Sequence, residues 1–411
     1  MANTLSERGN RRGTNEAFDG AIALEAILSV VKATQQRTGR AVQLHEPLFR
    51  GREREYVLNA IDSTFVSSVG EYVNRYEREL AAACGVDHAV VTMNGTAALH
   101  VCQLLVGVVA GDEVLVPALT FVATANAVTY CGATPHFCDV STKTLGLDPS
   151  RLDAHLHSVA ELADGGCRNR ITGRRIAAVM PMHTFGHPVE LDELLEVCRR
   201  WGLPLVEDAA EGLGSRYKGR HVGGFGRVGA LSFNGNKIVT TGGGGAVLTN
   251  DAGLARRAKH LTTTAKLPHR WAFNHDELGY NYRLPNLNAA LGCAQLEQLP
   301  EFLGAKRRLA LQYAQAFGSV PGARIFQDAE FAESNYWLVT MLLEDGESAK
   351  RDQFLELCHE NQVLVRPVWA SMHRQPAFRD CPRADLSITE DLEGRIVNLP
   401  SSVFITEDNA A

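Results

Sequence analysis

The sequence predicts an α/β protein. Its larger part should contain a mostly parallel sheet with helices on both faces, and a smaller α+β part should follow. Two observations carry this prediction. Short apolar runs alternate with helical stretches through the middle of the chain, and this texture changes after about residue 290. Repeated alternation of strand and helix is typical of a parallel sheet covered by helices. The 411 residues, 45% of them hydrophobic, are sufficient for two or three domains.

The individual elements follow from apolar periodicity and from the residues that interrupt it. Helices are predicted over residues 52–62, 71–84, 96–108, 124–131, 191–201, 291–317 and 350–361. Strands are predicted over residues 89–92, 113–116, 134–140, 176–180, 203–206, 336–343 and 363–368. The runs at 176–180 and 203–206 are almost entirely apolar, as strands buried on both faces of a sheet are.

Three regions result from this pattern. Residues 1–41 are predicted to be an N-terminal extension with a short helix near 20–34. Residues 42–290 form the large domain, which should carry the ligand site, and residues 291–411 form the smaller C-terminal domain.

Composition argues against several classes of protein. A net charge of −6 without a basic stripe argues against a nucleic-acid partner. The nine cysteines have scattered spacings and no CxxC pair, so we expect no metal site. No stretch approaches the roughly 20 apolar residues that span a bilayer, so we expect no membrane insertion. Free thiols in apolar segments suit a reducing compartment, and we expect a cytoplasmic protein.

Lys237 has an unusual setting. It is one of only eight lysines and lies between Asn234-Gly235-Asn236 and a run of four glycines at 242–245. Glycines let a backbone approach another group closely. The lysine could therefore form a Schiff base with a carbonyl compound, or it could be a solvated loop residue.

Two further motifs point to a bound ligand. Asp208 follows the buried run 203–206, at the strand end where open α/β sheets bind ligands. There it could keep a pyridine nitrogen protonated, or simply cap a helix. Gly95 and Thr96 join a strand to a helix, where backbone N–H groups can bind a phosphate or merely form a turn. A phosphate cup, a strand-end carboxylate and a reactive lysine are together what pyridoxal phosphate requires.

With these motifs in place, the sequence resembles the sugar-nucleotide aminotransferases of the DegT/DnrJ/EryC1/StrS type. These are pyridoxal-phosphate-dependent transferases of fold type I. The resemblance covers about residues 42–403. The motifs that carry it are residues 94–99, 117–126, 207–211, 232–245, 279–283 and 366–373.

The resemblance implies roles for residues around the cofactor ring. Lys237 would bind the cofactor covalently and move the proton between cofactor and substrate. Asp208 would bind the ring nitrogen, and Phe121 would stack on the ring. Glu211 matches a position near the phenolic oxygen that is often Gln in the family. The position of the reactive lysine is histidine in some dehydratases of the superfamily, so Lys237 favours transamination.

The resemblance also implies how the phosphate is held. Gly95, Thr96 and Ser232 would bind it from within the chain. Asn281 matches a residue that reaches the phosphate from a second subunit, which implies a homodimer with shared active sites. His183, in a Pro-x-His-x-x-Gly segment after the strand at 176–180, is either a second catalytic residue or a structural support for the pocket.

The acceptor sugar is predicted from a finer resemblance. Residues 44–47, 62–70 and 366–369 look like the branch that makes 4-amino sugars for bacillosamine and legionaminic acid. L-Glutamate would then donate its amino group to C4 of UDP-2-acetamido-2,6-dideoxy-α-D-xylo-hexos-4-ulose, and 2-oxoglutarate would leave. GDP-4-keto-6-deoxymannose, the substrate of GDP-perosamine synthases, is the alternative. Other pyridoxal-phosphate chemistry, and a non-catalytic regulatory or scaffold role on the same fold, are the competing classes.

Overall fold

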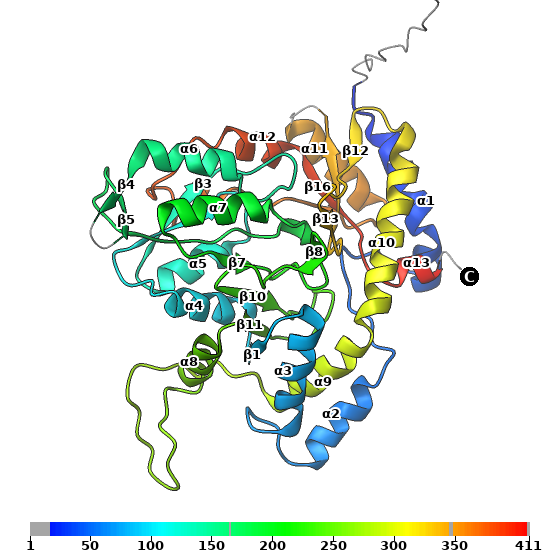
Figure 1. Ribbon diagram of the computed structural model, residues 1–411. Coiled ribbons are helices and arrows are strands. Elements are labelled where there is room, and N and C mark those ends of the chain that lie inside the picture. The colour runs from blue at the N-terminus through cyan, green and yellow to red at the C-terminus, as the bar shows by residue number, and fades with distance from the viewer. Residues whose placement is uncertain (1–16, 164–165, 345–347, 409–411) are drawn as a thin grey trace, which may run out of the picture.

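The computed structural model describes residues 17–163, 166–344 and 348–408 (Figure 1). The first sixteen residues of the predicted extension lie outside this part. Two bodies are visible, a large one around the central sheet and a smaller one that contains α10, α11 and α1. No helix within the described residues is long and apolar enough to cross a membrane.

The central sheet confirms the predicted mostly parallel arrangement. Its seven strands run in the order β3 (Thr134–Cys138), β2 (Glu113–Pro117), β6 (Ile176–Val179), β7 (Val206–Asp208), β10 (Val228–Ser232), β11 (Gly245–Thr249) and β1 (His88–Thr92). Parallel bridges from Val179 to Leu205 and from Met182 to Asp208 join β6 to β7. β11 runs in the opposite direction to the other strands and is antiparallel to both β10 and β1. The predictions did not include β10 and β11.

Helices cover both faces of this sheet because its strand residues alternate between two cores. Val114 and Val116 face one core and Leu115 faces the other. The first core contains α4 (Gly95–Leu105), α5 (Val122–Tyr130) and α8 (Ala252–Thr262). The second contains α3 (Glu71–Cys84), α6 (Pro149–Val159), α7 (Leu191–Trp201) and α9 (Asn286–Glu297). α2 (Glu53–Asp62) lies beside α9.

Shorter ladders lie at the edges of the large body. β4 (Ala160–Ala163) and β5 (Gly166–Asn169) form a hairpin. β8 (Arg216–Tyr217) pairs with β9 (Arg220–His221) and with β13 (Ala332–Glu333). The last of these pairings ties the segment before β14 to the large body.

An antiparallel sheet organises the smaller body. Its strands run in the order β12 (Ala323–Ile325), β14 (Val339–Leu343), β16 (Ile396–Leu399) and β15 (Arg366–Pro367). The helices around it are α10 (Leu299–Ala316), α11 (Ser348–Glu360), α12 (Ser387–Arg395) and α13 (Ile405–Asp408).

The structure corrects two predictions in this part of the chain. The single helix predicted over 291–317 is two helices, α9 and α10, which meet at Gln298. Pro300 in the first turn of α10 lacks the N–H that a continuous helix would need there. The strand predicted over 363–368 is only the two residues of β15, because Pro367 has no N–H to extend the ladder.

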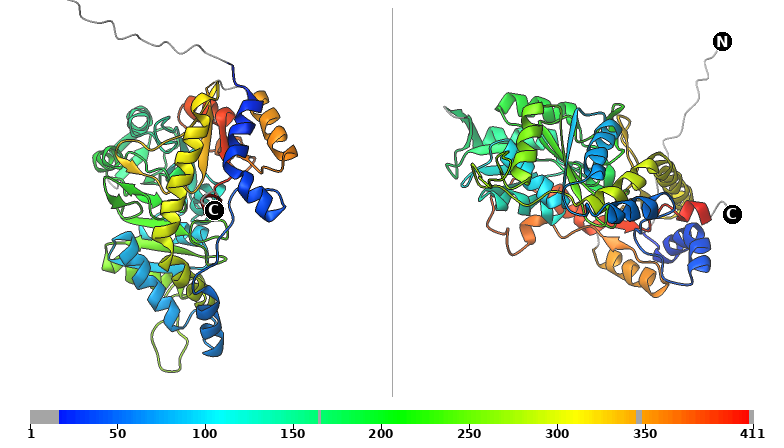
Figure 2. Two further views of the ribbon diagram at one scale, coloured as in Figure 1. Left: turned by 90° about the vertical axis from the view of Figure 1, so that its right-hand side faces the viewer. Right: turned by 90° about the horizontal axis from the view of Figure 1, so that it is seen from below.

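The helix of the predicted extension is α1 (Gly20–Thr38), which is longer than expected. Asp19 caps its first turn, and Gly39 ends it in the left-handed conformation. Its apolar face packs into the core of the smaller body, and Figure 2 shows α1 between α10 and α11. By its packing, α1 is part of the smaller body and not an appendage.

We expect Ile27→Ala to lower the free energy of unfolding by about 2–4 kcal/mol, because the Ile27 side chain is fully buried between α1 and the smaller body. Ile22→Ala on the same helix is the control, since Ile22 is 40% exposed. Urea unfolding followed by circular dichroism measures both. Equal losses in the two variants would contradict this account of α1.

Candidate active site

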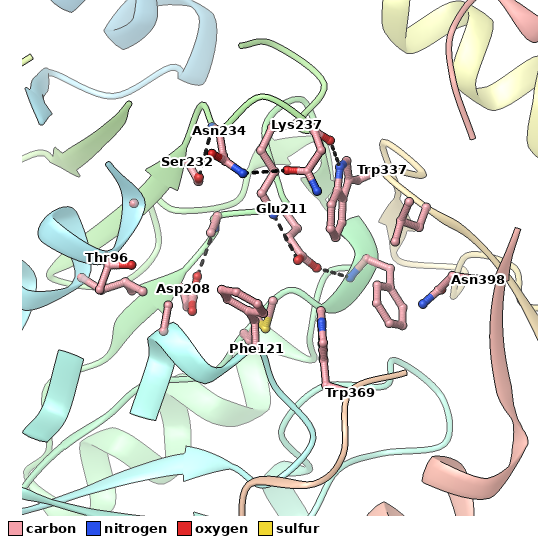
Figure 3. A pocket seen from close by; sticks show the side chains of 18 of the residues that line it. Thr96, Phe121, Asp208, Glu211, Ser232, Asn234, Lys237, Trp337, Trp369 and Asn398 are labelled. Carbon is pink, nitrogen blue, oxygen red and sulfur yellow. Dashed lines mark hydrogen bonds and ion pairs between the residues drawn. The ribbon is translucent and has the colours of Figure 1, made fainter. Parts of the chain in front are cut away.

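A cavity of about 480 Å³ opens where the carboxyl ends of the parallel strands face the smaller body (Figure 3). The large body contributes side chains from the ends of β7 and β10 and from the start of α4. The smaller body contributes Trp337, Arg366, Trp369 and Asn398. Of the residues predicted to form a site, seven line this cavity, namely Gly95, Thr96, Phe121, Asp208, Glu211, Ser232 and Lys237.

The start of α4 forms a cradle for an anion. Asn94 Oδ1 accepts from the Ala97 N–H at 2.8 Å and so shapes the first turn. A Cβ on Gly95 would lie 2.8 Å from the Cβ of Ser232, and one on Gly245 would lie 2.5 Å from the Asn94 carbonyl oxygen. Only glycines allow these backbones to come so close. The free N–H groups at the start of α4 and the side chains of Thr96 and Ser232 therefore border one narrow space, as a phosphate requires.

Asp208 is the last residue of β7, at the predicted strand end, and it is buried. Its Oδ2 accepts from the Thr124 hydroxyl at 2.7 Å and its Oδ1 accepts from the Ala210 N–H at 3.1 Å. Burial raises the pKa of Asp208, and these hydrogen bonds only partly oppose it. The carboxyl group is thus held in one orientation and would gain from a cationic partner such as a protonated ring nitrogen.

Lys237 and Glu211 form an ion pair inside the cavity, with 3.1 Å between Lys237 Nζ and Glu211 Oε1. The other oxygen of Glu211 accepts from the Phe185 N–H at 2.8 Å. Burial raises the pKa of Glu211 to about 7, although Lys237 and the Phe185 N–H act in the opposite direction. Glu211 can therefore take up or release a proton near neutral pH beside the lysine.

Trp337, a residue that no sequence motif indicated, contacts Lys237 from the side of the smaller body. The Lys237 Nζ lies 3.7 Å from the centre of the indole ring, and the indole N–H donates to the Asn236 carbonyl at 2.7 Å. The fully buried Lys306 donates to the Trp337 carbonyl at 2.7 Å and also to the Ser401 carbonyl. An aromatic residue 100 positions from the lysine carries no local signal of this contact.

Phe121 and Trp369 form an aromatic wall. Phe121 is 46% exposed at the cavity, with its ring centre 6.0 Å from that of Trp369. Trp369 also contacts Phe185, at 5.0 Å between ring centres. Trp369 belongs to the motif at 366–373, so the resemblance gave the only signal for it. An exposed ring face at this place suits stacking on a planar ligand.

The two remaining predicted residues do not line the cavity. His183 is fully buried, its Nε2 lies 3.1 Å from Glu207, and its Nδ1 accepts from the Val189 N–H at 3.3 Å. Both ring nitrogens are thus engaged away from the cavity. Asn281 is exposed and forms an antiparallel bridge with Thr263. It lies at the base of the segment 263–282, which projects from the body after α8.

These residues fit pyridoxal phosphate. The glycine cradle at α4 matches its phosphate, the buried Asp208 matches its ring nitrogen, and Lys237 matches its carbonyl carbon. Lys237 and Asp208 line the same cavity as Gly95, so the three contacts can be made by one molecule. The fold and the site together define a pyridoxal-phosphate-dependent transferase of fold type I.

The chain belongs to the DegT/DnrJ/EryC1/StrS aminotransferase family, whose model matches residues 48–411. It is accordingly a sugar-nucleotide aminotransferase that depends on pyridoxal phosphate and uses an amino donor. The family and the reaction class predicted from the motifs are confirmed, and the non-catalytic alternative is not supported.

Individual relatives cover most of the chain. The GDP-perosamine synthase of Caulobacter vibrioides is 38% identical over 89% of this chain and 94% of its own. That of Escherichia coli O157:H7 is 36% identical over 88% and 93%. Neither is named for bacillosamine or legionaminic acid. Among solved structures, aminotransferase TlmJ from Streptoalloteichus hindustanus has a TM-score of 0.78 and 29% identity, covering 87% of this chain and 93% of its own.

We expect the stability of the cofactor-free protein to depend on pH through Glu211. Its pKa is about 7 when folded, above its ordinary value, so the stability it contributes below about pH 4.5 is lost as the pH rises through 7. As the pH rises from 4.5 to 8, the free energy of unfolding of Glu211→Gln should increase by up to about 3 kcal/mol relative to that of the wild type. Urea unfolding at several pH values measures this, with the exposed Glu333→Gln as control. Parallel pH profiles for the wild type and Glu211→Gln would refute the assignment.

Proposed function

We propose that this protein transfers the amino group of L-glutamate to C4 of a GDP-linked 4-keto-6-deoxy sugar, namely GDP-4-keto-6-deoxymannose. The observation that carries the proposal is the ion pair of Lys237 and Glu211 in the cavity that also contains Asp208. Family membership supports the reaction, and the names of two relatives that cover about nine-tenths of the chain support the GDP-linked acceptor.

Different residues of the cavity transfer the proton and orient the cofactor. When bound, pyridoxal phosphate supplies a carbonyl group that accepts the amine and a ring that withdraws electrons. Lys237 is the base that removes and returns the proton at the reacting carbon. Glu211, 3.1 Å away and with a pKa near 7, stabilises the charge on Lys237 or accepts its proton. Asp208 keeps the ring nitrogen protonated, and Phe121 keeps the ring in place.

His183 acts, in this proposal, as a positioning residue. Its backbone N–H donates to the Asp208 carbonyl at 3.0 Å, and its ring contacts Glu207, which also accepts from the N–H groups of residues 223, 225 and 226. Burial alone would raise the pKa of Glu207, but these donors hold it below its ordinary value. A rigid, charged support behind Asp208 results from this network.

The proposal is tested first by spectroscopy. Protein with bound pyridoxal phosphate should show the visible absorption band of the cofactor joined to a lysine, and L-glutamate should bleach it. Lys237→Ala should lack the band and lose at least about 1,000-fold in activity, because it removes both the covalent link and the base. Lys218→Ala, an exposed lysine in an ion pair with Asp192, is the matched control. A normal band in Lys237→Ala would refute the role of this lysine.

The acceptor is tested on the glutamate-bleached protein. GDP-4-keto-6-deoxymannose should restore the band at a rate at least tenfold above that of UDP-2-acetamido-2,6-dideoxy-α-D-xylo-hexos-4-ulose. If the UDP-linked sugar restores the band faster, the proposed GDP-linked acceptor is wrong. The acceptor is then the UDP-linked sugar that the motifs at 44–47 and 62–70 suggest.

We further propose that the site is completed by a second copy of the chain. Asn281 lies at the base of the projecting segment 263–282, beside Thr263. The same segment exposes the apolar side chains of Trp271, Phe273 and Leu278 by 73%, 75% and 77%. Large exposed apolar side chains grouped on one segment favour an interface. Asn281 could then reach the phosphate cradle of the partner.

Mixing two inactive variants tests this arrangement. Lys237→Ala and Asn281→Asp should each be inactive, the second because its negative charge repels the phosphate. Unfolded and refolded together, they should regain up to about a quarter of wild-type activity, since half of the molecules would be mixed dimers with one intact site each. Each variant refolded alone is the control. No recovery despite mixed dimers would contradict a shared site.

A further inference from the structure

Arg366 and Asn398 face one another across the sheet of the smaller body. They are direct partners in the antiparallel register of β15 and β16, and both line the cavity. Directly opposed residues on neighbouring strands place their side chains on the same face of a sheet, about 4.5–5.5 Å apart at Cβ. The two side chains therefore lie next to each other in the part of the cavity wall that the smaller body forms.

Asn398 offers an N–H donor whose orientation is fixed. The residue is only 3% exposed, and its Oδ1 accepts from the hydroxyl of the buried Thr340 at 2.9 Å. With the oxygen occupied, the Nδ2 group is the part of the amide available to the cavity. Figure 3 shows this nitrogen on the side of Trp369. This N–H group is free to donate to an acceptor bound in the cavity.

Arg366 adds a positive charge at the same place. Within the described residues it forms no ion pair, whereas the two carboxylates of the cavity have their own partners: Asp208 with Thr124, and Glu211 with Lys237. The phosphate cradle at Gly95 is built from the large body, so it is a separate anion site. The cavity thus has a guanidinium and an amide donor that no anion of the protein or cofactor accounts for.

We propose that Arg366 and Asn398 form an anion subsite that binds a carboxylate of the amino donor. The two N–H groups of a guanidinium match the two oxygens of a carboxylate, and the Asn398 amide adds a third hydrogen bond. The diphosphate of the nucleotide sugar has the same chemistry, namely paired anionic oxygens, and could use the subsite in the second half of the reaction. This inference rests on the proposed function, because it gives the donor its place in the same cavity.

The test measures binding without turnover. Glutarate, which has the carbon chain of glutamate but no amino group, and GDP are titrated into protein loaded with pyridoxal phosphate, with heat as the readout. Arg366→Gln should raise the dissociation constant of glutarate at least tenfold. Asn398→Asp should raise it further, because this variant keeps the acceptor for Thr340 but replaces the donor by a negative charge. Arg324→Gln, on β12 of the same sheet and exposed, should stay within twofold of the wild type.

Each outcome has a defined meaning. Weakened glutarate binding with normal GDP binding supports the donor carboxylate, and weakening of both supports a shared subsite. Weakened GDP binding alone assigns the subsite to the diphosphate and overturns the donor assignment. Unchanged binding of both probes in both variants overturns the subsite altogether.

Controls separate this result from folding and from the proposed function. Each variant must retain the visible band of the cofactor, which shows that the Lys237 site is intact. Arg366→Lys, which keeps the charge but not the paired N–H groups, should lie between the wild type and Arg366→Gln. If the wild type itself lacks the band, the proposed function fails. If the band is present and glutarate binds all variants equally, only the subsite fails.

Discussion

The parallel pairing of β6 with β7 is the constraint on which the site depends. The His183 N–H donates to the Asp208 carbonyl at 3.0 Å, and the Asp208 N–H donates to the Pro181 carbonyl at 2.9 Å. These two bonds join the two halves of the central sheet at the carboxyl ends of both strands. Asp208 therefore lies in the middle of the sheet edge, with the end of β10 and its Ser232 on one side. A ligand bound at that edge can contact the Asp208 carboxylate, the start of α4 and Lys237 at the same time.

Burial raises the pKa values of Asp208 and Glu211, and hydrogen bonds hold both side chains in place. Asp208, Glu211 and Lys237 lie in a space from which the smaller body excludes part of the solvent. Taking charges out of water is costly, so each has a partner that limits the cost. The partners differ: Thr124 and Ala210 hold Asp208 rigidly, whereas Glu211 and Lys237 hold one another. The rigid group suits a permanent contact, and the mutually paired groups suit proton exchange.

The sequence predicted those parts of the fold that local chemistry determines. The bounds of α3 and α7 were predicted to the residue, because Gly85 and Gly202 end them in the left-handed conformation. β10 and β11 were missed, since each is only five residues long and includes Gly and Ala, which dilute the β-branched signal of Val228 and Val247.

The same distinction between local and long-range determinants applies to the residues of the site. The large-body side of the cavity was predicted because its residues lie in short motifs next to strand ends. The contacts of Trp337 and Asn398 depend on how the second sheet meets the first, which no local pattern records. Register is a long-range property: Arg366 and Asn398 are far apart in the chain and adjacent only through β15 and β16.

The place of α1 has a consequence for synthesis of the protein on the ribosome. α1 ends at Thr38, yet its partner α10 begins only at Leu299 and α13 ends the described chain. At roughly 5–20 residues per second, the apolar face of α1 waits on the order of tens of seconds for its partners. During that time the large body can already fold, while Ile27 and its neighbours remain exposed to other nascent chains. The earliest-synthesised of the described helices is thus among the last to be buried.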